Sequence, residues 1–209
     1  GLVAQWAALH SPAEFVIASI GSSRAAREWD WLKWLPHTSS PHSPLNAPHL
    51  ASSSTAIASL LSEIEEIVEL RGGEREEGVR LPTILVIIES DAPAEFGRLV
   101  ALAEGGWQRG VIVLWIAPDV TQLPAACRTY VALDNSPASK VGFVHSGDLV
   151  SPVSVEYLAP EAALALARGL APLTDLGAPI DDDSDLPRSV SFLELTGRAL
   201  AHDATAVVE

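Results

Sequence analysis

The sequence predicts an α/β fold: a three-layer, mainly parallel sheet with helices on both faces. Residues 84–88 and 111–116 are short runs of apolar side chains only, which is typical of strands that are buried on both faces. Between them, Phe96, Leu99 and Val100 follow the spacing of a helix. A helix between two such strands indicates that the strands are parallel neighbours in one sheet.

The first third of the chain reads as helix, strand, turn and short helix. The expected elements are a helix at 2–9, a strand at 15–20, a turn at 21–23 and a helix at 24–29. His10-Ser11-Pro12 marks the end of the first helix, because the residue before a proline rarely stays helical. Ser22 or Ser23 is the expected N-cap of the short helix.

Residues 36–54 are rich in Pro, Ser and His without any period, so we expect a surface loop. Its histidines, His37, His42 and His49, match no compact ligand spacing, and we expect them to be exposed and to bind no metal. A helix follows from Thr55, with its apolar positions at Ile57, Leu60, Leu61, Ile64, Ile67 and Val68.

The second half of the chain contains shorter elements. A solvated loop at 72–80 leads into the strand that ends at Glu89-Ser90-Asp91. Later elements are strands at 128–133, 142–145 and 153–158, a helix at 161–170, an acidic linker at 173–187 and a short helix at 189–198. We expect the three late strands to be edge strands of the same sheet, in either orientation. The sequence thus divides into a domain at 1–171 and a connection at 172–209.

Composition excludes several classes of protein. A formal net charge of −14 argues against a nucleic-acid partner, because such binding depends on Lys and Arg neutralising phosphates. The longest apolar runs are too short to span a bilayer. Cys127 is the only cysteine, which fits a reducing compartment, and its apolar surroundings predict a buried, unreactive side chain. With Gly1 first and no Met, we expect an excised piece of a longer protein.

Three of the six tryptophans, Trp29, Trp31 and Trp34, lie within six residues of each other. Two interpretations stay open. In one, Trp31 and Trp34 share a helical face with Leu35 and are buried against the sheet. In the other, the rings contact a neighbouring domain or subunit, because Trp is favoured at the centres of interfaces.

Five segments together resemble a known module: AALHSP at 7–12, REWDWLKWLPH at 27–37, ILVIIESD at 84–91, GVIVLWIA at 110–117 and LPAACRTYVAL at 123–133. They resemble EccC, the FtsK/SpoIIIE-type ATPase of actinobacterial type VII secretion systems. The resemblance covers roughly residues 1–171 and is closest to the membrane-proximal domain between the transmembrane helices and the first full ATPase domain. Residues 186–197 look like the connection toward that next domain.

The resemblance implies a degenerate P-loop NTPase architecture of the FtsK/RecA type. It also implies a place at the cytoplasmic face of the cell membrane, as part of a larger membrane protein that uses ATP and Mg²⁺. The implied partners are the other domains of the same ATPase and other subunits of the secretion complex. No membrane span is expected within the fragment itself.

The motif Gly-Lys-Ser/Thr of a phosphate loop does not occur in the sequence, whose only lysines are Lys33 and Lys140. By the resemblance, the helix at 2–9 follows that loop, which places the loop before Gly1. Glu89 stands at the position of the Walker B acid, but Ser90 replaces the acidic base that usually follows. Glu89 and Asp91 are therefore candidates for a vestigial nucleotide site, or acids that merely end a strand.

Three functions remain in competition. The leading one is a non-catalytic, ATPase-like module that couples membrane anchors to the motor, with no cofactor, metal or catalytic residue of its own. The second is a genuine ATP-binding and hydrolysing domain whose phosphate loop lies upstream of residue 1. The third is a regulatory domain that binds a small ligand at the carboxyl edge of the sheet.

Overall fold

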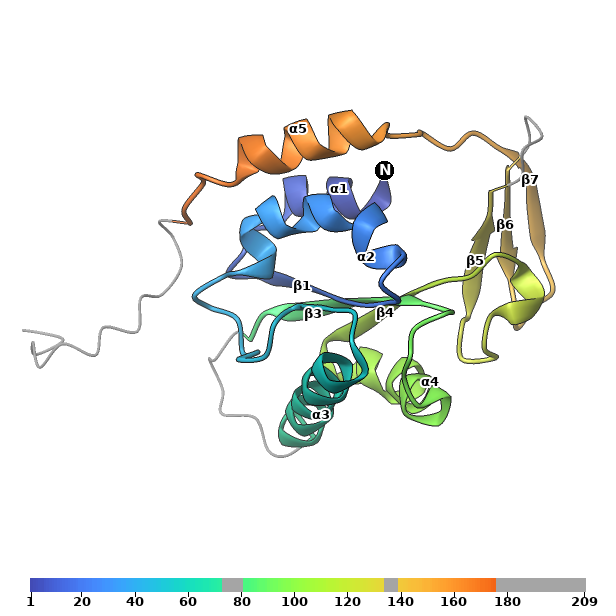
Figure 1. The fold of residues 1–209 in the computed structure, drawn as a ribbon. Coiled ribbons are helices and arrows are strands. Elements are labelled where there is room, and N and C mark those ends of the chain that lie inside the picture. Colours follow the sequence, from blue (N-terminus) through green and yellow to red (C-terminus); the bar gives the residue numbers. More distant parts are fainter. Residues whose placement is uncertain (73–80, 134–138, 176–209) are drawn as a thin grey trace, which may run out of the picture. The chain divides into compact units, whose positions relative to one another are not determined.

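A four-stranded parallel sheet, in the order β2-β1-β3-β4, forms the middle layer of the protein (Figure 1). Its strands are β1 (Phe15–Ile20), β2 (Leu50–Ala51), β3 (Thr83–Glu89) and β4 (Val111–Ile116). The structure is a computed structural model, and it describes residues 1–72, 81–133 and 139–175. These residues belong to one compact unit, Gly1–Leu176.

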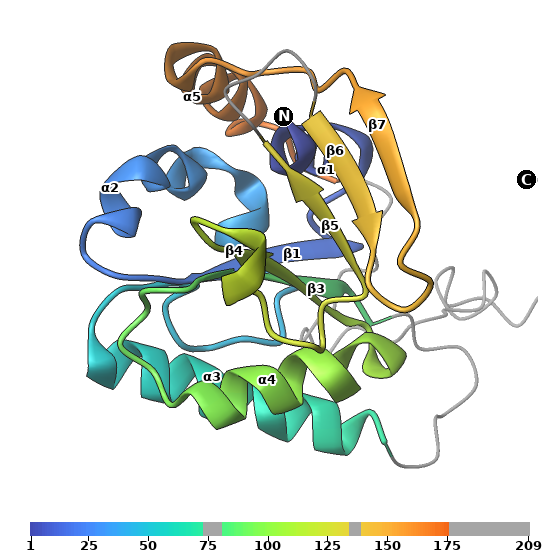
Figure 2. The same ribbon diagram turned by 90° about the vertical axis from the view of Figure 1, so that its right-hand side faces the viewer.

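Helices cover both faces of this sheet, as the apolar strands predict (Figures 1 and 2). One face carries α1 (Leu2–Leu9), α2 (Ala25–Glu28) and α5 (Pro160–Leu170), and the other carries α3 (Ser54–Leu70) and α4 (Phe96–Gly105). Short 3-10 helices lie at η1 (Asp30–Trp34), η2 (Pro36–Thr38), η3 (Gly106–Arg109) and η4 (Val120–Gln122). The predicted three-layer α/β fold is confirmed.

Successive side chains of a strand point to opposite faces of the sheet, and this divides the core into two apolar clusters, one on each face. Side chains at even positions of β1 and β3, such as Val16 and Val86, pack with Leu60 and Ile64 of α3. Those at odd positions pack with the helices of the other face, and this second cluster includes Ile17, Leu85, Ile87, Val3, Ala7, Leu32, Leu35 and Ala167. Helix α3 begins at Ser54, one residue before the predicted start, where the Ser53 side chain accepts a hydrogen bond from the Ala56 amide.

The three late strands do not extend the main sheet, so that expectation is wrong. They form a separate antiparallel sheet of β5 (Thr129–Ala132), β6 (Ser139–Phe143) and β7 (Leu149–Val153), which lies apart from β1 to β4 in Figure 1. The predicted limits of the last two strands are also wrong, because the chain turns at Gly147, where φ is +73°. The Tyr130 ring lies against Gly142 at a point where any β-carbon would collide with it.

The predicted surface loop at 36–54 is partly buried, which corrects a second expectation. His37 and His49 are 2% and 8% exposed, and Leu45 lies in the core. Nδ1 of His49 donates to the Ile17 carbonyl at 3.1 Å, and its Nε2 accepts from Ser43 Oγ at 3.0 Å. Burial lowers the pKa of both histidines. A segment without any period can still enter a core when side chains satisfy its polar groups.

Several predictions fall outside what the structure describes. These are most of the loop at 72–80, most of the linker at 173–187 and the helix at 189–198. Within the described residues, no helix has both the length and the apolar character that a bilayer crossing requires.

Cys127 is only half-buried at the border of the core, and burial raises the pKa of its thiol.

Candidate functional site at the carboxyl edge of the sheet

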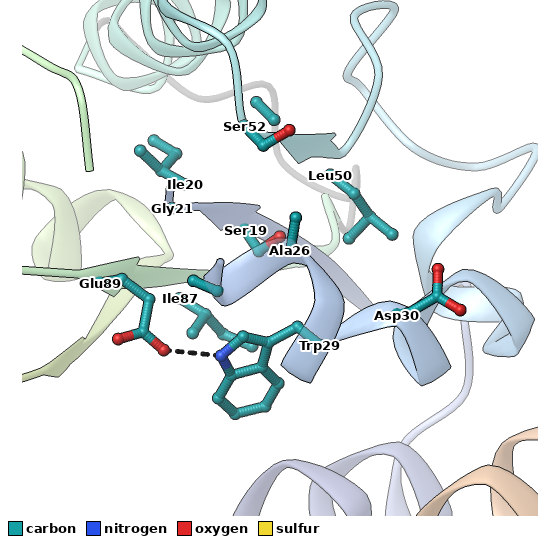
Figure 3. Close-up of a pocket in the computed structure, with 12 residues that line it drawn as sticks. Ser19, Ile20, Gly21, Ala26, Trp29, Asp30, Leu50, Ser52, Ile87 and Glu89 are labelled. Carbon is teal, nitrogen blue, oxygen red and sulfur yellow. Dashed lines mark hydrogen bonds between the residues drawn. The ribbon is translucent and has the colours of Figure 1, made fainter. Parts of the chain in front are cut away.

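The carboxyl ends of β1 and β3 lie side by side, because the two strands are parallel and pair from Phe15 with Thr83 to Ile20 with Ile88. This is the edge at which open α/β sheets usually bind ligands. A cavity of about 150 Å³ opens there (Figure 3). It is lined by Ser19, Ile20, Gly21, Ala25, Ala26, Trp29, Asp30, Leu50, Ala51, Ser52, Ile87 and Glu89.

Glu89, the last residue of β3, lies at the wall of this cavity and is half-buried. Trp29 Nε1 donates a hydrogen bond to Glu89 Oε1 at 2.7 Å, which Figure 3 shows as a dashed line. Burial raises the pKa of Glu89, and the negative charges of Asp91 and Glu28 add to this. The bond from Trp29 acts in the opposite direction, because it stabilises the ionised carboxylate.

Asp91 lies in the turn after β3, and its side chain faces the turn after β1. Ser22 Oγ donates to Asp91 Oδ2 at 2.9 Å, and Arg24 forms an exposed ion pair with the same oxygen at 3.3 Å. Ser90 donates its backbone N–H to the Ile116 carbonyl at 2.9 Å, which continues the ladder between β3 and β4. Asp91 therefore joins two turns at the edge, while Glu89 alone of the two acids lines the cavity.

The three clustered tryptophans have three different environments. Trp29 enters the site, and Trp31 packs beside it with ring centroids 6.2 Å apart. Trp34 is 40% exposed, with the Arg168 guanidinium 4.9 Å from its ring centroid. Of the expected buried face, Trp31 packs against the cluster that contains Leu35, whereas the expectation is wrong for Trp34, which is exposed.

Sequence reasoning placed Glu89 and Asp91 together but missed the contact between Glu89 and Trp29. A signal for it was present. Trp29 follows β1 by a single short helix, and Glu89 ends the neighbouring parallel strand, so both had to lie near the same edge of the sheet. Ser52 of the cavity had no signal, because it follows β2, which comes from the segment that was expected to be a loop. Ser19 lies near the carboxyl end of the predicted strand β1, so its place at this edge was predictable.

A parallel sheet layered between helices, with an acid at the end of an inner strand, is an α/β fold of the kind that P-loop NTPases also have. The solved structure of EssC ATPases 2 and 3 from Geobacillus thermodenitrificans has this fold, with a TM-score of 0.58 at 14% identity. The match covers 81% of this chain and 40% of that chain. No family model matches the chain.

Two curated relatives identify the group of proteins more narrowly. ESX-4 secretion system protein EccC4 of Mycobacterium tuberculosis is 37% identical over 76 residues, covering 32% of this chain and 6% of that protein. ESX secretion system protein EccC of Geobacillus thermodenitrificans is 26% identical over 209 residues, covering 99% of this chain and 14% of that protein. The chain is thus related to the EccC proteins of ESX secretion systems, and the resemblance to EccC found in the sequence is confirmed. It spans only a small part of the length of these relatives.

Proposed function

We propose that this domain is the membrane-proximal module of a type VII secretion ATPase and that it transmits motion or load through protein contacts without hydrolysing ATP. The observation that carries this proposal is the hydrogen bond between Trp29 and Glu89. It engages the one acid that stands at the Walker B position, and Ser90 occupies the place of the catalytic base.

The residues at the carboxyl edge are a poor match for Mg²⁺ and a triphosphate. Mg²⁺ requires carboxylate oxygens in near-octahedral geometry at roughly 2.0–2.1 Å, and the phosphates need a Lys and a turn of free N–H groups. Glu89 is instead turned to an indole, and Asp91 to Ser22 and Arg24. The lining of the cavity contains neither Lys nor Arg. The described residues therefore do not form a complete binding site for the nucleotide, and we derive no catalytic step from them.

The names of the relatives, which are secretion system proteins, support a proposal for the partners and the location. We propose that the domain contacts other domains of the same ATPase and other subunits at the cytoplasmic face of the membrane. The net charge of −14 disfavours nucleic acid as a partner. It favours basic protein surfaces, because opposite potentials steer association.

One observation favours the alternative of a working ATP site completed by residues upstream of Gly1. The amino terminus of α1 lies at the same edge of the sheet as the carboxyl ends of β1 and β3 (Figure 1). A phosphate loop that leads into α1 would have to lie on that side. A regulatory domain for a small ligand has weaker support, because the cavity of about 150 Å³ is smaller than the ~300 Å³ at which ligand sites typically begin.

Calorimetric titration of the full protein with ATP and Mg²⁺, together with an assay of phosphate release, separates these functions. To isolate this domain, the active sites of the other ATPase domains are first disabled by substitution. We then expect no saturable binding below ~1 mM and no turnover. Micromolar binding that requires Mg²⁺, with turnover that is lost in E89Q, would establish the alternative instead. The variant E66Q is the matched control, because Glu66 is an exposed acid on α3 that does not line the cavity.

A further inference from the structure

The cavity at the carboxyl edge combines an aromatic ring with a carboxylate on each side of it. Figure 3 shows Trp29 between Glu89 and Asp30, with the Glu89 carboxylate directed at the indole nitrogen. Ser19 and Ser52 add two hydroxyl groups to the lining. No basic side chain belongs to the lining, so its charged groups are all acidic.

Glu89 forms no ion pair within the described part of the chain, and the charge of Arg24 is the smallest of the influences on its pKa. Its Oε1 accepts from a neutral donor, the Trp29 indole. Asp30 pairs with Lys33, whose Nζ lies 2.7 Å from Asp30 Oδ2, and both side chains are largely exposed. Arg24 is engaged with Asp91 at 3.3 Å. A half-buried carboxylate in this setting is stabilised by any cation that can reach its free oxygen.

We infer that this cavity receives the side chain of an arginine presented by a partner protein. A guanidinium is planar, so it can lie against the Trp29 ring while its N–H groups donate to Glu89 Oε2 and to the serine hydroxyls. It is also more weakly hydrated than an ammonium group, which favours it in a half-buried site. This inference rests on the proposed function, because it identifies one contact by which the module binds a partner.

The size of the cavity favours a single side chain over a free metabolite. At about 150 Å³ it is well below the roughly 300–1,000 Å³ of ligand pockets, and one extended side chain fills such a space. The charge of the whole chain favours a basic protein as the source, since 27 acidic residues stand against 13 Lys and Arg. A buried Arg in an aromatic pocket is also a common anchor at protein interfaces.

The test uses the indole N–H signals of the six tryptophans in ¹H–¹⁵N NMR spectra, with the Trp29 signal assigned from W29F. The probe is N-acetyl-arginine-N-methylamide, titrated to ~50 mM because one side chain binds in the millimolar range. The neutral analogue with citrulline is the matched control ligand. We expect the arginine probe to shift the Trp29 signal with a Kd about tenfold or more below that of the citrulline probe.

Two variants locate the binding. E89Q keeps an oxygen for the Trp29 bond but removes the charge, and we expect it to weaken the arginine probe about tenfold. D30N changes an exposed residue, so it should fold even if E89Q does not, and we expect about threefold weaker binding. E66Q should bind as the unchanged protein does. The inference is overturned if the Trp29 signal does not move at ~50 mM, if citrulline binds equally well, or if D30N and E89Q leave the affinity unchanged.

The probe carries no phosphate, so this result is read independently of the nucleotide titration. Binding of ATP would contradict the proposed function, and loss of the arginine effect would contradict only the identity of the ligand.

Discussion

At the scale of single residues, the bond between Trp29 and Glu89 joins two features that the sequence presents 60 residues apart. Burial and neighbouring acids raise the pKa of Glu89, and the indole donor is the largest influence that lowers it. The hydrogen bond from the indole thus opposes the rise in the pKa of Glu89 without cancelling it. The role of Trp29 is to position this acid and to stabilise its charge.

The variant W29F removes the indole donor and keeps an aromatic ring, so we expect the pKa of Glu89 to rise further. Because the folded pKa already exceeds the unfolded one, the native state holds the proton over a range of pH above the ordinary Glu value. Stability therefore falls as pH rises through that range, and it should fall more steeply in W29F. The measurement is a ¹³C NMR titration of the Glu89 carboxyl, combined with denaturant unfolding between about pH 4 and pH 7.

The matched control for this prediction is W34F, because Trp34 lies on the exposed side of η1. Its Glu89 titration should equal that of the unchanged protein. A pKa of Glu89 that stays the same or falls in W29F would contradict the assignment of the hydrogen bond.

At the scale of elements, the 3-10 helix η1 fixes which residues of the Trp-rich string support the fold. Leu32 is completely buried, whereas Trp34 is 40% exposed. Leu32 packs in the cluster that includes Ile17, Leu85 and Ala167, so η1 helps to hold α5 over the sheet. The tryptophans stand out in the sequence, but the leucines between them make the larger contribution to the core.

We therefore expect L32A to lower the free energy of unfolding by about 2–5 kcal/mol, because it opens a cavity in a packed core. W34A should cost about 1 kcal/mol or less, mainly through its contact with Arg168. Denaturant unfolding of both variants measures the difference. A larger loss of unfolding free energy in W34A than in L32A would contradict this, because it would show that Trp34 contributes more to the core than Leu32 does.

The elements also show what the sequence could predict. The strands β1, β3 and β4 and the helix α3 were predictable, because apolar runs and helical spacing carry their own signal. Strand β2 was not predictable, because its two residues form a strand only by pairing with β1. The same pairing includes the hydrogen bond from the Ser19 amide to the His49 carbonyl, and no local pattern marks it in the sequence. The late strands were found, but pairing partners depend on contacts that a single sequence does not contain.

At the scale of the whole molecule, the described part is a layered α/β scaffold, and the cavity at its carboxyl edge is lined by two acids and by no Lys or Arg. The candidate acids Glu89 and Asp91 were predictable from their position after a buried strand. The engagement of Glu89 by Trp29 and of Asp91 by Ser22 was not, because both depend on side-chain directions across two turns. These contacts are the basis of our proposal that the module couples and does not hydrolyse.

The most direct measurement of this claim is paramagnetic broadening of the Trp29 indole signal by Mn²⁺ and ATP in the full protein. Mn²⁺ replaces Mg²⁺ in oxygen-rich sites and broadens only nearby nuclei. If Glu89 is held by Trp29 and binds no nucleotide-bound metal, the Trp29 signal keeps the same width as that of the distant Trp107 at equal Mn²⁺ and ATP. Selective loss of the Trp29 signal, reversed in E89Q, would show a metal and nucleotide at this edge and contradict the account.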